Sequence, residues 1–334
     1  MQSSVPEFSD TFLRYRLLAD KRIHAVARIE SSLLKGARRY FDEQGFTEVK
    51  VPHLTRATGA CENIDTMFAV PWFGEGERFL AQTGQLYLEV MTPYLKHVWC
   101  EGPSFRAEPD VDSRHLAEFP LLEIEFEGGF EELLGHVEGT IRSMVSTALA
   151  ERKDDMEVLG VADPVRLDLT SPGSFGRMTY SEAVEKLGLS FGDDLKHAHE
   201  KRLVEMTGGK PLFVTHYPKS VKFFNMKEND DDPRLVNSAD LLLPFSGEAV
   251  GAAEREFEYE RLLARLQESS MFRLLRARGG GLGDFAWYLN YYRDFGGSLH
   301  SGCGIGFNRV TQYFLGADDI RGATVWPVNR ESGV

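Results

Sequence analysis

Residues 105–125 constrain the fold most, because two strand-like runs flank a charged loop there. Apolar and charged residues alternate on both sides of the loop, in residues 104–108 and 121–125. A period of two directs successive side chains to opposite faces of a strand. We therefore expect an antiparallel hairpin. Four charged residues then occupy defined faces of its strands: Arg106, Glu108, Glu123 and Glu125.

The loop of this hairpin, residues 109–117, carries Arg114 and His115, and Phe119 follows it. A guanidinium on a rigid strand can make bidentate contact with a phosphate, and cations on a loop can reach the outer phosphates of a nucleotide. Phe119 is placed to stack on a base. The hairpin is thus suited to a nucleotide triphosphate. The alternative is a salt-bridged surface hairpin, because exposed Arg and Glu are common on strands.

The hairpin resembles motif 2 of the class II aminoacyl-tRNA synthetases, with FRAE, RHLAEF and EIE in the form of the aspartyl and asparaginyl branch, subclass IIb. Residues 44–54 resemble motif 1 and residues 302–310 resemble motif 3, in the same order as in the family. Residues 213–218 and 240–248 resemble asparaginyl-type sequences. The resemblance runs from about residue 15 to the C-terminus. It implies an α+β catalytic fold in which an antiparallel sheet is flanked by helices.

The chain is expected to have an N-terminal tail at residues 1–14 and one catalytic domain at residues 15–334. A small, mainly helical insertion is expected at about residues 151–209. Apolar residues at helical spacing predict a long helix over residues 21–43, ended by Gly45. Further helices are expected at residues 131–150, 180–187, 254–269 and 285–295, and strands at 211–227 and 239–247. No P-loop or dinucleotide-binding fingerprint is present.

The resemblance also implies the residues of a nucleotide site. The residues implied to bind ATP are Arg106, Glu108, Arg114, His115, Phe119 and Arg309. Arg106 and Arg309 would be the catalytic residues, Arg106 at the α-phosphate and Arg309 over the adenine and at the γ-phosphate. Asn308 departs from the Glu or Asp often found beside that arginine.

Asp240 and Glu248 are the candidate metal ligands, eight positions apart on a predicted strand and its exit. Mg²⁺ prefers one or two carboxylates together with phosphates and water molecules. The resemblance implies that this pair holds Mg²⁺ beside ATP. The alternative is a solvated acidic pair.

The resemblance implies an amino-acid pocket as well, in which one group of residues binds the α-ammonium and two cations face the other end of the substrate. These residues are Glu62, Gln85 and Glu123, and then Lys222 and Arg255. Two cations suit a free carboxylate better than a neutral amide, because an unpaired buried charge is costly. Leu88, however, stands where the aspartyl branch has a lysine. Aspartate and asparagine therefore both remain candidates.

The formal net charge is −13, and no Lys/Arg-rich block occurs apart from residues 14–28. The sequence therefore gives no positive sign of a nucleic-acid partner, although tRNA is not excluded. No apolar run approaches the roughly 20 residues of a membrane span, and residues 1–12 lack a signal pattern. We expect a cytoplasmic protein without a membrane partner. Its cysteines, Cys61, Cys100 and Cys303, suggest neither a disulfide framework nor a structural zinc site.

Motif 1 begins close to the N-terminus, where it leaves no room for the anticodon-binding OB-fold of asparaginyl- and aspartyl-tRNA synthetases. The leading hypothesis is therefore an AMP-forming ligase like the stand-alone asparagine synthetase-related members of the family. It would adenylate aspartate or a close analogue and transfer the acyl group to ammonia or an amine. The alternatives are transfer to tRNA, transfer to a carrier protein, and a non-catalytic regulatory paralogue. Motif 1 implies a homodimer.

Overall fold

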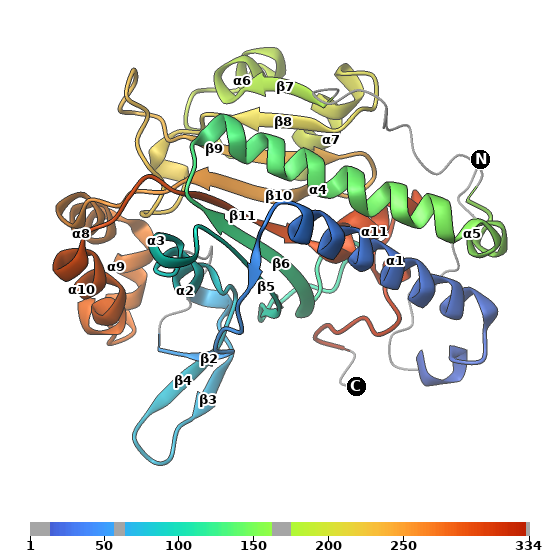
Figure 1. Ribbon diagram of the computed structural model, residues 1–334, viewed down its shortest axis with the longest axis horizontal. Coiled ribbons are helices and arrows are strands. Elements are labelled where there is room, and N and C mark those ends of the chain that lie inside the picture. Colours follow the sequence, from blue (N-terminus) through green and yellow to red (C-terminus); the bar gives the residue numbers. More distant parts are fainter. Residues whose placement is uncertain (1–13, 57–63, 162–174, 332–334) are drawn as a thin grey trace.

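A mixed eight-stranded sheet forms the centre of the computed structural model, which describes residues 14–56, 64–161 and 175–331 (Figure 1). In spatial order its strands are β1 (Thr47–Glu48), β5 (His97–Phe105), β6 (Glu118–Phe126), β11 (Ser301–Gly306), β10 (Gly247–Glu254), β9 (Ser238–Leu243), β8 (Leu212–Thr215) and β7 (Gly176–Thr179). The six inner strands are antiparallel, whereas β1 and β7 pair with their neighbours in parallel. The predicted α+β class with an antiparallel sheet is confirmed.

A second, three-stranded antiparallel sheet projects from the body (Figure 1). Its strands are β2 (Leu54–Thr55), β4 (Glu77–Leu80) and β3 (Ala69–Pro71). The α-helices are α1 (Lys21–Glu43), α2 (Gln85–Glu89), α3 (Thr92–Leu95), α4 (Phe130–Glu151), α5 (Lys153–Leu159), α6 (Tyr180–Leu187), α7 (His197–Met206), α8 (Tyr259–Glu268), α9 (Ser270–Ala277), α10 (Ala286–Phe295) and α11 (Phe307–Leu315). Short 3₁₀ turns lie at Arg14–Leu17, Ile64–Thr66, Lys219–Val221, Leu282–Phe285 and Ile320–Ala323.

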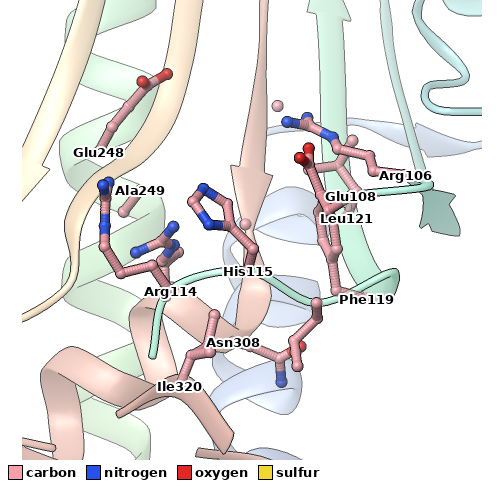
Figure 2. Close-up of a pocket in the computed structure, with 14 residues that line it drawn as sticks. Arg106, Glu108, Arg114, His115, Phe119, Leu121, Glu248, Ala249, Asn308 and Ile320 are labelled. Carbon is pink, nitrogen blue, oxygen red and sulfur yellow. The ribbon is translucent and has the colours of Figure 1, made fainter. Parts of the chain in front are cut away.

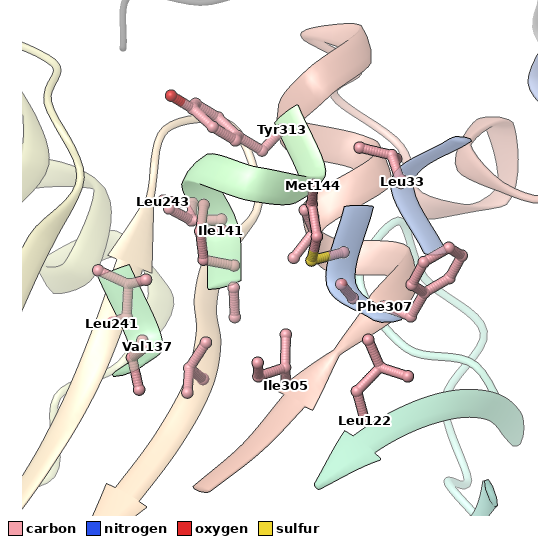
Figure 3. Packing of buried hydrophobic residues seen from close by; sticks show 14 of the residues in the cluster. Leu33, Leu122, Val137, Ile141, Met144, Leu241, Leu243, Ile305, Phe307 and Tyr313 are labelled. Carbon is pink, nitrogen blue, oxygen red and sulfur yellow. The ribbon is translucent and has the colours of Figure 1, made fainter. Parts of the chain in front are cut away.

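Helices α1 and α4 cover one face of the large sheet and form the main core with it (Figures 1 and 3). Val137 and Ile141 of α4 pack with Leu33 of α1 against sheet residues such as Leu241 and Ile305. The opposite face of the sheet is therefore left for the polar residues of the candidate site.

Helix α1 has the bounds that the sequence predicts. Its start is fixed by Asp20, whose carboxylate accepts a hydrogen bond of 2.9 Å from the backbone N–H of Arg22. Its end is followed by Gly45, which adopts a positive φ of 73° that few other residues tolerate. Its apolar face is buried at intervals of three or four residues: Ile23, Val26, Ile29, Leu33, Ala37 and Phe41.

Three predicted boundaries need correction. The helix expected at residues 254–269 begins only at Tyr259, because Glu254 still pairs with Ser301 in the sheet. The strand expected over residues 211–227 ends at Thr215, where His216 turns the chain with a φ of 59°. The strand expected over 239–247 is β9 followed by a turn at Phe245, which leads into β10.

Within residues 175–209, β7 extends the large sheet and α6 has the predicted bounds, starting with a capping box between Thr179 and Glu182. Cys100 and Cys303 are free and buried, and Cys61 lies outside the described residues. In the described part of the chain, no helix has the length and apolar character needed to cross a membrane.

Gly36 sets the distance between α1 and α4. A Cβ added there would lie 2.4 Å from the carbonyl oxygen of Ser143 and 2.7 Å from the Cα of Met144. These are backbone atoms, so they cannot move aside as a side-chain tip can. The Ser143 hydroxyl also donates a 2.7 Å hydrogen bond to the Gly36 carbonyl.

We predict that Gly36→Ala lowers the free energy of unfolding by about 1–3 kcal/mol, because it forces the two helices apart. Gly135→Ala is the matched control, since Gly135 lies in α4 and its added Cβ meets no atom within 4 Å. That control should raise the free energy of unfolding by up to about 1 kcal/mol. Urea unfolding measures both. Equal stability of the two variants would contradict the close helix contact.

Candidate active site

All six residues expected to bind ATP line one cavity of about 210 Å³. They are Arg106, Glu108, Arg114, His115, Phe119 and Arg309. In Figure 2, Arg106, Glu108 and Phe119 lie on one side of the cavity and Arg114 and Glu248 on the other. The cavity lies between the hairpin loop and the elements β10, β11 and α11. Motif 2 and motif 3, far apart in the sequence, thus meet at one cavity.

Arg106 and Phe119 come together where the hairpin strands end. The backbone N–H of Arg106 donates to the Ala117 carbonyl at 2.8 Å, which extends the pairing of β5 with β6. The guanidinium carbon of Arg106 lies 5.2 Å from the ring centroid of Phe119, in cation–π contact. A planar cation and an aromatic face are therefore presented side by side.

Asp112 organises the loop, a role that the sequence analysis did not assign. Its Oδ1 accepts hydrogen bonds from the backbone N–H groups of Arg114 and His115, at 2.8 and 2.9 Å. Its Oδ2 lies 2.8 Å from Nδ1 of His115. Burial raises the pKa of Asp112, but these contacts bring it below its ordinary value. An Asp two residues before an arginine on a loop is the signal that could have identified this turn.

Arg309 is in the first turn of α11, and its guanidinium is held by the residue that precedes β10. Its Nη1 donates a 2.5 Å hydrogen bond to the carbonyl of Ser246. Burial, together with the nearby charge of Arg114, lowers the pKa of Arg309 to about 10. Two guanidiniums that repel each other in one cavity favour a ligand with several negative charges, such as a triphosphate.

Asn308 does not hold Arg309 directly. It is 2% exposed, and its Nδ2 donates to Glu30 of α1 at 3.2 Å and to the Ala323 carbonyl at 3.4 Å. Burial raises the pKa of Glu30 to about 8. The departure from Glu or Asp at position 308 therefore belongs to the contact between α11 and α1.

The two candidate metal ligands share one face of the sheet. Glu248 lines the cavity, and a Cβ added at Gly251, the residue paired with Asp240, would lie 3.6 Å from Oε1 of Glu248. Both oxygens of Asp240 accept hydrogen bonds of 2.7 Å from Lys222. Carboxylate oxygens on one face fit Mg²⁺. Asp240 and Glu248 would hold the metal, and Asp240 would give up its contact with Lys222 to do so.

Glu200 of α7 is a third carboxylate next to this pair. It is 7% exposed, accepts a 3.3 Å hydrogen bond from the backbone N–H of Glu248, and lies 3.7 Å from Arg114. Burial raises its pKa. It connects the hairpin loop to β10, and His197 lies 3.6 Å from it.

Arg255, expected as a cation facing the substrate, lies in a buried ion-pair network. Its Nη2 donates to Oε1 of Glu125 at 2.6 Å, and its Nε lies 4.0 Å from Oε1 of Glu89. Burial raises the pKa of Glu125 to about 7. Burial also raises the pKa of Glu89, but His300 and Arg255 outweigh it and bring the pKa below its ordinary value. The expectation of a free carboxylate as substrate assumed two uncompensated cations. In the structure, both Lys222 and Arg255 already have carboxylate partners.

Glycine at position 302 makes the Glu125–Arg255 contact possible. Gly302 of β11 lies between β6 and β10, and it pairs with Glu125 on one side. A Cβ at Gly302 would lie 2.1 Å from the carboxylate carbon of Glu125. The side chain of Glu125 therefore crosses over β11 at this glycine to reach Arg255.

The residues expected at the α-ammonium lie around the start of α2. Nε2 of Gln85 donates to Oε1 of Glu89 at 2.7 Å. Glu123 accepts hydrogen bonds from the Thr83 hydroxyl and, at 2.7 Å, from the backbone N–H of Gly84. The third expected residue, Glu62, lies outside the described residues. The spacing of four between Gln85 and Glu89 on a helix is the signal that could have identified Glu89.

Residues 9–330 match the model of the family "tRNA synthetases class II (D, K and N)". The chain belongs to this family. It is 36% identical to asparagine–tRNA ligase of Pyrococcus abyssi over 321 residues, which cover 94% of this chain and 70% of that protein. The ligase of Thermococcus kodakarensis is 35% identical over 329 residues, covering 96% and 73%. The structure of asparaginyl-tRNA synthetase from Pyrococcus horikoshii complexed with asparaginyl-adenylate has a TM-score of 0.85 at 34% identity, covering 96% of this chain and 72% of that one.

This class II synthetase is an adenylate-forming ligase, as the sequence analysis expected. The relatives named above are asparagine–tRNA ligases, and nothing among them supports a stand-alone asparagine synthetase-like branch. The comparisons thus show that the chain belongs to the group of Asp, Lys and Asn enzymes. The amino acid that it activates and the acceptor of the acyl group are a finer assignment.

We predict that Arg309→Ala in this synthetase slows ATP–pyrophosphate exchange at least about tenfold. It removes charge-assisted phosphate contacts of about 1.5–3 kcal/mol. Arg293→Ala is the control, because Arg293 is an exposed residue of α10 paired with Asp294. Thermal unfolding shows whether either variant has lost its fold. Normal exchange by folded Arg309→Ala would exclude Arg309 from the ATP site.

Proposed function

We propose that this enzyme activates asparagine with ATP and transfers the asparaginyl group to tRNA. The observation that carries the choice of amino acid is the compensation of Arg255 by Glu125 and Glu89, all at most 3% exposed. The names of the relatives favour the tRNA alternative over the transfer to ammonia that ranked first in the sequence analysis.

The charge balance supports a neutral amide. An aspartate side chain would bring another carboxylate to a site that already holds Glu89 and Glu125, and an uncompensated buried charge is costly. Asparagine instead offers an amide N–H₂ that can donate to Glu89 and a carbonyl that can accept from Arg255. This placement rests on the implied roles of Gln85 and Arg255 at the amino acid.

The chemistry then follows from the cavity proposed to bind ATP and from the amino-acid pocket. The α-carboxylate of asparagine attacks the α-phosphorus of ATP, pyrophosphate leaves, and Arg106 stabilises the charge that develops on the phosphate. Arg114, His115 and Arg309 bind the outer phosphates. Asp240 and Glu248 would hold Mg²⁺, which would neutralise part of the phosphate charge when bound. A tRNA hydroxyl then attacks the adenylate carbonyl, and AMP leaves.

Purified enzyme should catalyse pyrophosphate exchange with asparagine at least about tenfold faster than with aspartate, and should then charge tRNA. A tenfold preference corresponds to about 1.4 kcal/mol of differential binding. Glu89→Gln tests whether the Glu89 carboxylate causes this preference. Because the substitution removes one negative charge, the preference for asparagine over aspartate should fall, while pyrophosphate exchange at saturating ATP should remain.

The acceptor is tested in parallel with tRNA and with ammonium, by mass spectrometry of the products. Aspartate-dependent exchange with ammonium-dependent formation of asparagine would reinstate the ammonia ligase. Absence of exchange with either amino acid would favour the regulatory paralogue. We also propose the homodimer implied by motif 1, through α1 and β1. Light scattering of the same preparation would reject it by giving the monomer mass.

A further inference from the structure

Three potential metal ligands meet outside the ATP cavity. They are His97, the first residue of β5, and Glu132 and His136 of α4. Among the residues that the structure describes, their ligand atoms all lie within 4.8 Å of one another. Glu132 and His136 are four positions apart, so they project from the same side of the helix. The cluster joins the start of a sheet strand to the helix that covers the sheet.

His136 supplies the decisive observation. The residue is 7% exposed, and its Nε2 is buried without a hydrogen-bond partner. This atom lies 3.9 Å from Oε1 of Glu132, and Nδ1 is hydrogen-bonded to the hydroxyl of Tyr40 at 3.1 Å. A buried nitrogen without a partner is costly. A histidine oriented by a hydrogen bond at one nitrogen, with the other directed at a carboxylate, has the arrangement of a metal ligand.

The surroundings support the same interpretation. Apolar rings enclose the imidazoles: Phe46 lies 5.0 Å from His97, and Phe126 lies 4.6 Å from His136, between ring centroids. Gly128 gives the Glu132 carboxylate room, because a Cβ there would lie 2.5 Å from Oε2.

We propose that His97, Glu132 and His136 bind a divalent transition metal of the zinc class. Two imidazole nitrogens and one carboxylate form a three-ligand set that suits Zn²⁺ and leaves a fourth position for water. Mg²⁺ prefers oxygen ligands and would not compete well. Ligand atoms around Zn²⁺ stand about 3.3 Å apart, as bonds of about 2.0–2.1 Å require. The Glu132 side chain is exposed, so its carboxylate is free to move closer to the two imidazoles. The proposal is independent of the amino acid and acceptor that the enzyme uses.

Zinc binding to chelator-treated, tag-free enzyme tests the proposal, by calorimetry in the presence of excess Mg²⁺. We expect one Zn²⁺ per chain, a higher Tm when the metal is bound, and the visible absorption of four-coordinate Co²⁺ when cobalt replaces zinc. Glu132→Gln and His136→Ala should each abolish stoichiometric binding. Tyr40→Phe should weaken it about 10- to 100-fold, since Tyr40 only orients His136.

His24→Ala is the matched control, because His24 is exposed on α1 and lies outside the cluster. It should bind zinc as the unchanged enzyme does. Glu132→Gln alters an exposed side chain, so the test holds even if His136→Ala fails to fold. Absence of stoichiometric binding by the unchanged enzyme, or equal affinity in Glu132→Gln, would overturn the proposal.

Discussion

The buried ion pair between Arg255 and Glu125 is the constraint on which the arrangement of the site depends. It joins the end of β10 to β6 across the intervening strand β11, and Gly302 leaves the room for this crossing. Both partners are at most 3% exposed, so the removal of either would leave a buried charge without its hydrogen-bonded partner. Strand β6 of motif 2, strand β11 of motif 3 and strand β10 are therefore fixed relative to one another.

The two halves of the site differ in charge because of this pairing. On the nucleotide side, Arg106, Arg114 and Arg309 gather around a cavity that suits a polyanion. On the other side, Arg255 is already compensated by Glu125 and Glu89. Such a site suits a highly charged ligand next to a neutral side chain. This contrast, rather than the number of cations in the sequence, supports asparagine.

Elements set by local interactions could be predicted from the sequence. Helix α1 has its predicted bounds because Asp20, an apolar period and Gly45 all act within a few residues. The six residues expected to bind ATP were chosen through motifs with fixed positions, and they line one cavity. Strand β10 was missed, because only one strand, over residues 239–247, was expected before the helix. The pairing of Glu254 with Ser301 extends the sheet to the residue where that helix was expected to begin.

The partners of the charged residues could not be predicted, because they depend on how distant segments approach. Lys222 binds Asp240 and Arg255 binds Glu125, contacts that no local spacing encodes. The sequence therefore displayed two cations without their partners, and this favoured a free carboxylate as substrate. Asp112, Glu89 and Glu200 were likewise visible as acids. Their contacts with the loop backbone, with Gln85 and with the backbone of Glu248 follow only from the fold.

The most direct test of this account is the affinity of the enzyme for stable analogues of the two aminoacyl-adenylates, asparaginyl- and aspartyl-sulfamoyl adenosine, measured by calorimetry. The adenosine part is the same in both, so the difference reports the side-chain site alone. Compensation of Arg255 predicts that the asparaginyl analogue binds at least about tenfold more tightly, or about 1.4 kcal/mol. Equal affinity, or tighter binding of the aspartyl analogue, would show that a cation remains available to the substrate and would contradict the account.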